Sequence, residues 1–225
     1  MLLLVVLFVF IIICVASTNA KTKPYGLKEF YIVYAGKFTV ESKAAEVCTT
    51  VSDRGGAGVI YEKGNAKFVI VSIYFNLDDA NKVKEQIKPV FSDCDILKIT
   101  APKLSKSSCN LIEKQQQCKM FYTNLYAFCK ELYNLVLSVD KGEVTSSHVY
   151  KQVMQYKQKF VLISDKLKAQ TDNVSKEMHS SLLIVEQQIS SFFNSAFIAN
   201  SVAKNLKKLY VNSIIEFASM CESIK

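Results

Sequence analysis

Two stretches near the start of the chain share the same order of apolar and polar positions. In the first, an alternating run over residues 31–38 is followed by the small apolar residue Ala44; in the second, a run over residues 67–74 is followed by Ala80. Strict alternation is typical of a β-strand, and apolar residues spaced three or four apart are typical of one face of a helix. The pattern therefore predicts that a strand followed by a helix occurs twice.

Turn-forming residues divide the stretch from 29 to 104 into six elements. We expect strand, helix, strand, strand, helix and strand at residues 30–38, 41–54, 59–61, 68–75, 77–89 and 95–100. A glycine cluster at residues 55–58 ends the first helix, and Gly64-Asn65 is a hairpin signal. This order predicts an α+β fold in which a four-stranded antiparallel sheet packs on two helices.

From residue 105 onward, the apolar positions follow helical spacing only. All three prolines and six of the seven glycines lie before this point, so few residues that would break a helix remain. The expected helices cover residues 111–139, a heptad seam at 149–167, and the remainder from a cap at 171–173, with a hinge near 195–201. We therefore expect two domains, a mixed one at 29–104 and an all-α hairpin or bundle at 105–225.

Residues 2–16 form an uncharged apolar run, and small polar residues follow it up to Ala20. As a helix, this run would span about 23 Å, which is less than the roughly 30 Å hydrocarbon core of a bilayer. Residues 1–20 are therefore either a signal peptide cleaved after Ala20 or a single-pass membrane anchor, and residues 21–28 are a linker. In the first case the chain would be secreted; in the second it would stay at the cell membrane with its bulk outside the cytoplasm.

The formal net charge is +8 over 225 residues. No run of five or six like charges indicates a nucleic-acid tail, and a mild basic excess suits attraction to an anionic envelope surface. The same strand and helix order occurs in RNA-recognition modules, but their glycine-rich and basic signature is missing. We therefore expect no nucleic-acid partner.

Residues suited to catalysis or metal binding are scarce. The two histidines, His148 and His179, have no cysteine or carboxylate at a spacing that would define a dyad or a metal site. The seven cysteines make an odd count and include no Cys-x-x-Cys pair. Cys118 and Cys129 fall on one helical face, where we expect them to be buried as small hydrophobes. The sequence predicts a non-enzymatic protein without a cofactor or a metal.

Residues 28–102, roughly a third of the chain, resemble the SPOR (sporulation-related repeat) domain. The matching positions are Phe30, Tyr31, Val33, Ala35, Gly36 and Phe38 with Ala44 after them, Gly56-Ala57-Gly58, and Val69, Val71 and Tyr74 with Ala80. The resemblance implies a four-stranded antiparallel sheet backed by two helices that binds peptidoglycan glycan strands. Such proteins are typically anchored in the membrane and act in cell division or sporulation.

The resemblance also implies that the glycan binds on the sheet face turned away from the two helices. Alternation predicts that Tyr34, Phe68, Ile70 and Ser72 point to this face, with Lys37 and Tyr61 at its edge. Aromatic rings there would stack on sugar rings, and tyrosine hydroxyls would donate hydrogen bonds. The alternative is a scaffold whose sheet face docks a protein or its own helical domain. In either case, the helical domain can bind a protein partner.

Overall fold

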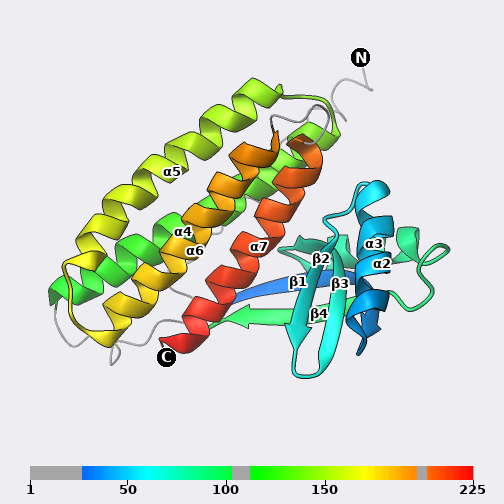
Figure 1. Ribbon diagram of the computed structural model, residues 1–225, viewed down its shortest axis with the longest axis horizontal. Helices are drawn as coiled ribbons and strands as arrows, with labels where there is room; N and C mark the ends of the chain where they lie inside the picture. Colours follow the sequence, from blue (N-terminus) through cyan, green and yellow to red (C-terminus); the bar gives the residue numbers. More distant parts are fainter. Residues whose placement is uncertain (1–26, 103–111, 197–201, 225) are drawn as a thin grey trace, which may run out of the picture.

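The computed structural model describes residues 27–102, 112–196 and 202–224 (Figure 1). The fold is α+β, as predicted: a four-stranded antiparallel sheet with two helices, followed by four further helices. In chain order the elements are β1 (Lys28–Phe38), α2 (Glu41–Asp53), β2 (Val59–Lys63), β3 (Ala66–Tyr74), α3 (Leu77–Ile87), β4 (Asp95–Ala101), α4 (Ile112–Asp140), α5 (Ser146–Lys168), α6 (Asn173–Ala196) and α7 (Val202–Ser223).

The two similar runs form the centre of the sheet. The strand order is β2-β3-β1-β4, so β1 and β3, which carry the runs, are neighbours in the middle. Each is followed by a helix, α2 or α3, and the alanine that the two runs share is fully buried in both helices, as Ala44 and as Ala80. The duplication seen in the sequence thus corresponds to two structural halves of one sheet.

One face of the sheet packs on α2. A small core forms there from Ala35, Ala44, Val51 and Val69, with partly buried apolar side chains around it. The α3 helix contacts β1, β3 and β4. Asn76, just before it, is its N-cap, because the Asn76 side chain accepts a hydrogen bond from the Asp79 backbone N–H.

The helices α4 to α7 form a bundle in which consecutive helices run in opposite directions (Figure 1). The predicted heptad seam is buried along α5, at Val149, Val153, Phe160, Ile163 and Leu167. Asp172 caps α6 by accepting a hydrogen bond from the Ser175 backbone N–H. The expected break in the last helical stretch is also found: α6 ends at Ala196 and α7 begins at Val202, with residues 197–201 outside the described residues.

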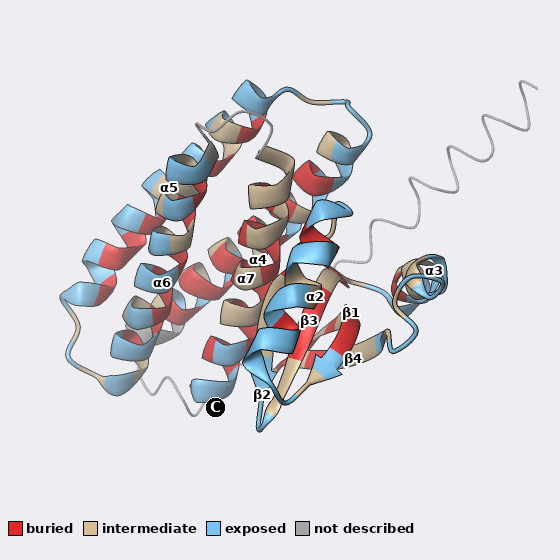
Figure 2. Ribbon diagram, turned by 45° about the vertical axis from the view of Figure 1, so that its right-hand side comes forward, coloured by how far each residue is buried: buried red, intermediate tan, exposed pale blue. Residues whose placement is uncertain are grey.

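The sheet and the bundle share one hydrophobic core. Strand residues in this shared core are Phe30, Ile32, Ile70, Ile73, Ile99 and Ala101, and they are joined by buried side chains from all four bundle helices. Figure 2 shows buried residues on the strands and on the helices that face them. The boundary expected between residues 104 and 105 therefore separates two types of secondary structure. It does not separate two hydrophobic cores.

The predicted signal peptide or anchor, residues 1–20, and nearly all of the linker after it lie outside the described residues. Within the residues that the structure describes, no helix is long and apolar enough to cross a membrane.

Candidate functional site

The sheet face opposite α2 and α3 is the predicted binding face. The sequence left open whether a glycan strand binds there or whether a protein, or the chain's own helical domain, docks on it. In the structure, α7 lies against it and contacts β2, β3 and β4 (Figure 1). The Phe217 ring of α7 meets the Phe30 ring of β1 edge to face, with centroids 6.1 Å apart. The Tyr210 hydroxyl donates a 2.7 Å hydrogen bond to the backbone carbonyl of Ile73. The chain's own helix thus covers part of the predicted binding face.

Three of the six predicted site residues gather around the ring of a fourth, Phe68. Phe68 contacts Tyr34 edge to face at a centroid distance of 5.1 Å and Tyr61 at 6.5 Å. Lys37 Nζ lies 5.7 Å from the centroid of the Phe68 ring. We call these four residues the aromatic cluster. Phe68 itself is only 7% exposed, so a ligand would meet the half-buried tyrosines and the exposed lysine around it.

The other two predicted residues do not join the aromatic cluster. Ile70 is fully buried in the core that the sheet shares with the bundle. Ser72 pairs with Val33, whereas Ile70 pairs with Tyr34, because a β-bulge adds one residue to β3 between these pairs. Cross-strand partners point to the same face, so Ser72 lies on the face of Val33, opposite to that of Tyr34. The expectation that Ser72 shares a face with Tyr34 is wrong for this reason.

A cavity of about 320 Å³ opens beside the aromatic cluster, between the sheet and the C-terminal turns of α7. Its polar lining comes from three elements: Tyr61, Glu62 and Lys63 of β2, Lys98 and Thr100 of β4, and Ser219 and Glu222 of α7. Tyr61 belongs both to the cavity wall and to the aromatic cluster. The cavity is at the lower end of the size range of small-molecule sites.

The ionisable groups of this region are held in defined charge states. Burial, with the carboxylate of Glu222 adding to it, raises the pKa of Tyr61, and burial also raises the pKa of Tyr34. Both hydroxyls therefore stay protonated and able to donate at neutral pH. A hydrogen bond to Glu29 raises the pKa of Lys98, whose Nζ lies 2.6 Å from the Glu29 carboxylate. The cavity thus offers the Tyr61 hydroxyl as a donor and, in Lys98, a lysine that is already paired with Glu29.

The histidines stand apart from this site, on α5 and α6. His148 is exposed in the first turn of α5, where its backbone N–H bonds the capping Thr145 hydroxyl. Across residues 27–102, 112–196 and 202–224, no group of three or more His, Cys, Asp or Glu side chains could hold a metal ion.

The cysteines of the bundle are packing residues. Cys118 and Cys129 are buried, as their position on one helical face predicts. Cys129 and Cys221 are free thiols; burial raises the pKa of Cys129 far above its usual value and that of Cys221 to about 12. A thiol that stays protonated is a poor nucleophile. These two cysteines therefore offer no reactive thiolate.

Sequence reasoning did not identify α7 as the covering helix, although it carried a usable signal. The buried residues of α7 include Leu206, Leu209, Tyr210, Val211, Ile214, Phe217, Ala218 and Met220. Such positions cannot all lie on one stripe, and a helix that is apolar on most sides is buried on most sides. The composition of α7 thus indicated a helix with two packing partners, which the structure identifies as the bundle and the sheet.

Comparisons with protein-family models, with curated proteins and with solved structures found no match to this chain.

Proposed function

We propose that this chain is a non-enzymatic interaction protein, a scaffold whose SPOR-like sheet docks its own helical bundle. The shared core supports the proposal most directly, since α7 fills the face on which a ligand of the sheet would otherwise lie. Phe30, whose ring contacts Phe217 of α7, is fully buried, and Ile70 is fully buried in the shared core. A ligand on these side chains would have to displace a helix whose own apolar residues also pack into the bundle.

A second candidate is binding of peptidoglycan glycan strands by an exported, membrane-associated protein of cell division or sporulation. The aromatic cluster favours it, because Tyr34, Tyr61 and Phe68 gather on the sheet beside a polar cavity. Two tyrosines that keep their protons, next to a cation, suit hydroxyl-rich ligands. The apolar run at residues 2–16 is the sequence feature that supports export.

Sacculus binding by the full chain separates the two candidates. Purified sacculi are incubated with the chain before and after amidase removal of the stem peptides, and the retained fraction is measured. For the scaffold we expect retention that does not rise after amidase treatment. If the retained fraction rises after amidase treatment, and if Tyr34→Ala lowers that fraction, the scaffold proposal is wrong.

The control variant is Tyr31→Ala, on the same strand. Tyr31 pairs with Tyr74 and its hydroxyl bonds Glu29, outside the aromatic cluster. If the cluster binds glycan, Tyr34→Ala and Phe68→Ala weaken retention and Tyr31→Ala does not. Circular dichroism of each variant checks that the fold is kept.

A further inference from the structure

The outer face of α5 is turned away from the rest of the molecule. α5 lies on the side of the bundle away from the sheet and packs mainly on α6 (Figure 1). Its buried residues, from Val149 to Leu167, follow one stripe, and Figure 2 shows exposed positions along the helix. The side of α5 opposite the buried stripe is therefore open to a partner, and we call it the outer face.

Positive charge is concentrated on α5. The helix carries five lysines and one acidic residue, Asp165. In α4, α6 and α7 the basic and acidic residues balance to within one charge. Half of the formal net charge of +8 thus lies on this one helix.

Most of this charge is not neutralised within the protein. Four of the lysines are exposed: Lys151, Lys159, Lys166 and Lys168. None of the four forms an ion pair with a described residue. Lys159 Nζ lies 4.7 Å from the centroid of the Tyr156 ring, a contact that leaves its charge in place. The fifth, Lys157, donates to the Ser190 hydroxyl of α6 instead.

Three large apolar side chains are exposed on the same face. Met154 is 40% exposed, Val161 42% and Leu162 64%. Single exposed apolar residues are ordinary on protein surfaces, but these three are grouped, because at 3.6 residues per turn they fall within about 100° of arc. The outer face therefore has an apolar centre.

The exposed lysines surround this apolar centre. At the same helical spacing, Lys151 falls inside the apolar arc, and Lys159, Lys166 and Lys168 fall within about 60° of its ends. Asp165 also falls inside the arc and is the single acidic residue of the helix. With four lysines against one carboxylate, the face stays positive.

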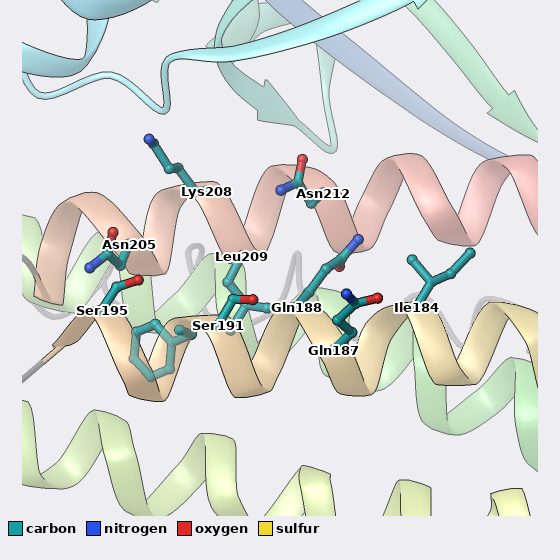
Figure 3. A pocket seen from close by; sticks show the side chains of 10 residues that line it. Ile184, Gln187, Gln188, Ser191, Ser195, Asn205, Lys208, Leu209 and Asn212 are labelled. Atoms are coloured by element: carbon teal, nitrogen blue, oxygen red, sulfur yellow. The ribbon is translucent and has the colours of Figure 1, made fainter.

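The neighbouring groove between α6 and α7 has a different character. Its volume is about 290 Å³, and carboxamides and hydroxyls make up most of its polar lining (Figure 3). Lys208 is the one charged residue among the lining residues described, and Figure 3 shows its side chain directed away from α6. The combination of clustered lysines and exposed apolar side chains thus belongs to α5.

This combination favours a lipid bilayer over other anionic partners. Anionic headgroups attract lysines at the membrane surface, and apolar side chains enter the boundary between headgroups and acyl chains. The long lysine stem keeps its charge at the headgroups while the apolar centre lies deeper. Nucleic acid would leave the apolar centre unused, and α5 offers it no arginine and no fully exposed aromatic ring. A protein segment would fit a groove better than the convex surface of one helix, whereas a flat bilayer needs no groove.

We propose that the outer face of α5 binds the surface of a bilayer that contains anionic lipids. The lysines pair with lipid phosphates, and Met154, Val161 and Leu162 enter the interface between headgroups and acyl chains. This contact goes beyond the proposed scaffold role. It depends neither on what the sheet face binds nor on the apolar run at residues 2–16.

A tryptophan on this face can report the contact, because the chain has none of its own. Leu162→Trp in the full chain is titrated with phosphatidylcholine vesicles, with and without phosphatidylglycerol, and the tryptophan emission is recorded. We expect a blue shift that requires phosphatidylglycerol and is lost at high salt. The control is Leu77→Trp, at a leucine of α3 that is 45% exposed, and its emission should not shift. This local signal is needed because residues 2–16 can attach the chain to vesicles of any charge.

Charge reversal tests the part played by the lysines. In the Leu162→Trp chain, Lys166→Glu should raise the lipid concentration at half-maximal shift about tenfold or more. Lys43→Glu, at an exposed lysine of α2, makes the same change in net charge and should leave that concentration nearly unchanged.

Several results would overturn the proposal. They are no shift with anionic vesicles in Leu162→Trp and in a second reporter, Val161→Trp, an equal shift without phosphatidylglycerol, and equal weakening by Lys166→Glu and Lys43→Glu. A shift with polyuridylic acid or polyglutamate, and none with vesicles, would assign the face to nucleic acid or to an acidic protein. Circular dichroism confirms that each variant is folded. Since sacculus retention reports on the sheet and the emission shift on α5, failure of one leaves the other standing.

Discussion

Individual polar residues of α7 show how this helix serves two partners. The buried Tyr210 hydroxyl satisfies the Ile73 carbonyl of β3, and burial raises the pKa of Tyr210 well above its ordinary value. Such a hydroxyl remains a donor at every physiological pH. Glu216 lies on the same helix, next to the core residue Phe217. Burial destabilises its ionised form, which is the usual form of a carboxyl group at neutral pH.

Glu216 should make the stability of the protein depend on pH. Burial raises the pKa of Glu216 above its ordinary value of 4.5, so the folded chain holds this proton more tightly than the unfolded chain. The stabilisation from the protonated form is complete below that ordinary value and is lost as pH rises through the folded pKa. We expect Glu216→Gln to raise the urea midpoint relative to the native chain at pH 7.5 and to leave it nearly unchanged at pH 4.

The variant and the native chain are compared at the same pH each time, so the contributions of the titrating groups that they share cancel. Glu177→Gln, at an exposed position of α6, is the matched control and should shift neither midpoint. A Glu216→Gln variant that is less stable than the native chain at pH 7.5 would show that the carboxylate makes a favourable interaction that outweighs its burial.

At the scale of elements, the junction between α2 and β2 depends on Gly58. This residue has a φ of +55°, and a Cβ there would lie 2.6 Å from the Cys48 carbonyl oxygen of α2. Gly64, in the β2–β3 turn, has a similar φ of +59°, but a Cβ there would meet no atom within 4 Å. We expect Gly64→Ala to cost about 1 kcal/mol, from left-handed backbone alone, and Gly58→Ala to cost clearly more. Urea denaturation of both variants measures the difference, and equal costs would show that α2 moves aside freely.

The elements themselves were predictable, and the reason is local. Alternation and helical spacing are properties of a single segment, so β1, β3 and α2 begin and end within two residues of the expected positions. The hinge before α7 was predictable too, because an uninterrupted helix would have been unusually long. Each of these features is determined by neighbours in the sequence.

The site was predictable only in part, because it depends on contacts between elements. Aromatic residues on adjacent strands placed Tyr34, Tyr61 and Phe68 together, as their alternation suggested. The face of Ser72 instead depends on a bulge, which appears only once β3 is paired with β1. Ile70 is buried in the core that the sheet shares with helices at least forty residues later in the chain. Apolar residues around α7 indicated a second partner without indicating which one.

At the scale of the whole molecule, the question is whether the sheet and the bundle unfold as one unit. Figure 2 shows buried positions continuing from the strands into the bundle, and the shared core contains residues of both. The Phe217 ring joins them, since it contacts Phe30 of β1 and also Tyr122 and Tyr126 of α4. Small domains with one core usually unfold cooperatively. Cooperative unfolding would distinguish this chain from one in which a sheet domain and a helical domain are merely connected.

Phe160→Ala tests this at a distance from the sheet. Phe160 lies in α5, is buried, and packs on Phe128 of α4 and Tyr156 of α5, so its truncation leaves a cavity and should cost about 3–5 kcal/mol. If the molecule is one unit, hydrogen exchange will show the same loss of protection at the Ile32 and Ile70 amides of the sheet as in the bundle. Leu162→Ala, at a neighbouring position that is 64% exposed, should change protection by about 0.5 kcal/mol or less. Sheet amides that keep their protection in Phe160→Ala, while bundle amides lose theirs, would mean that α7 docks on a sheet able to stay folded by itself. In that case the face beneath α7 could open to a ligand without unfolding the sheet, and the glycan-binding candidate would gain over the scaffold.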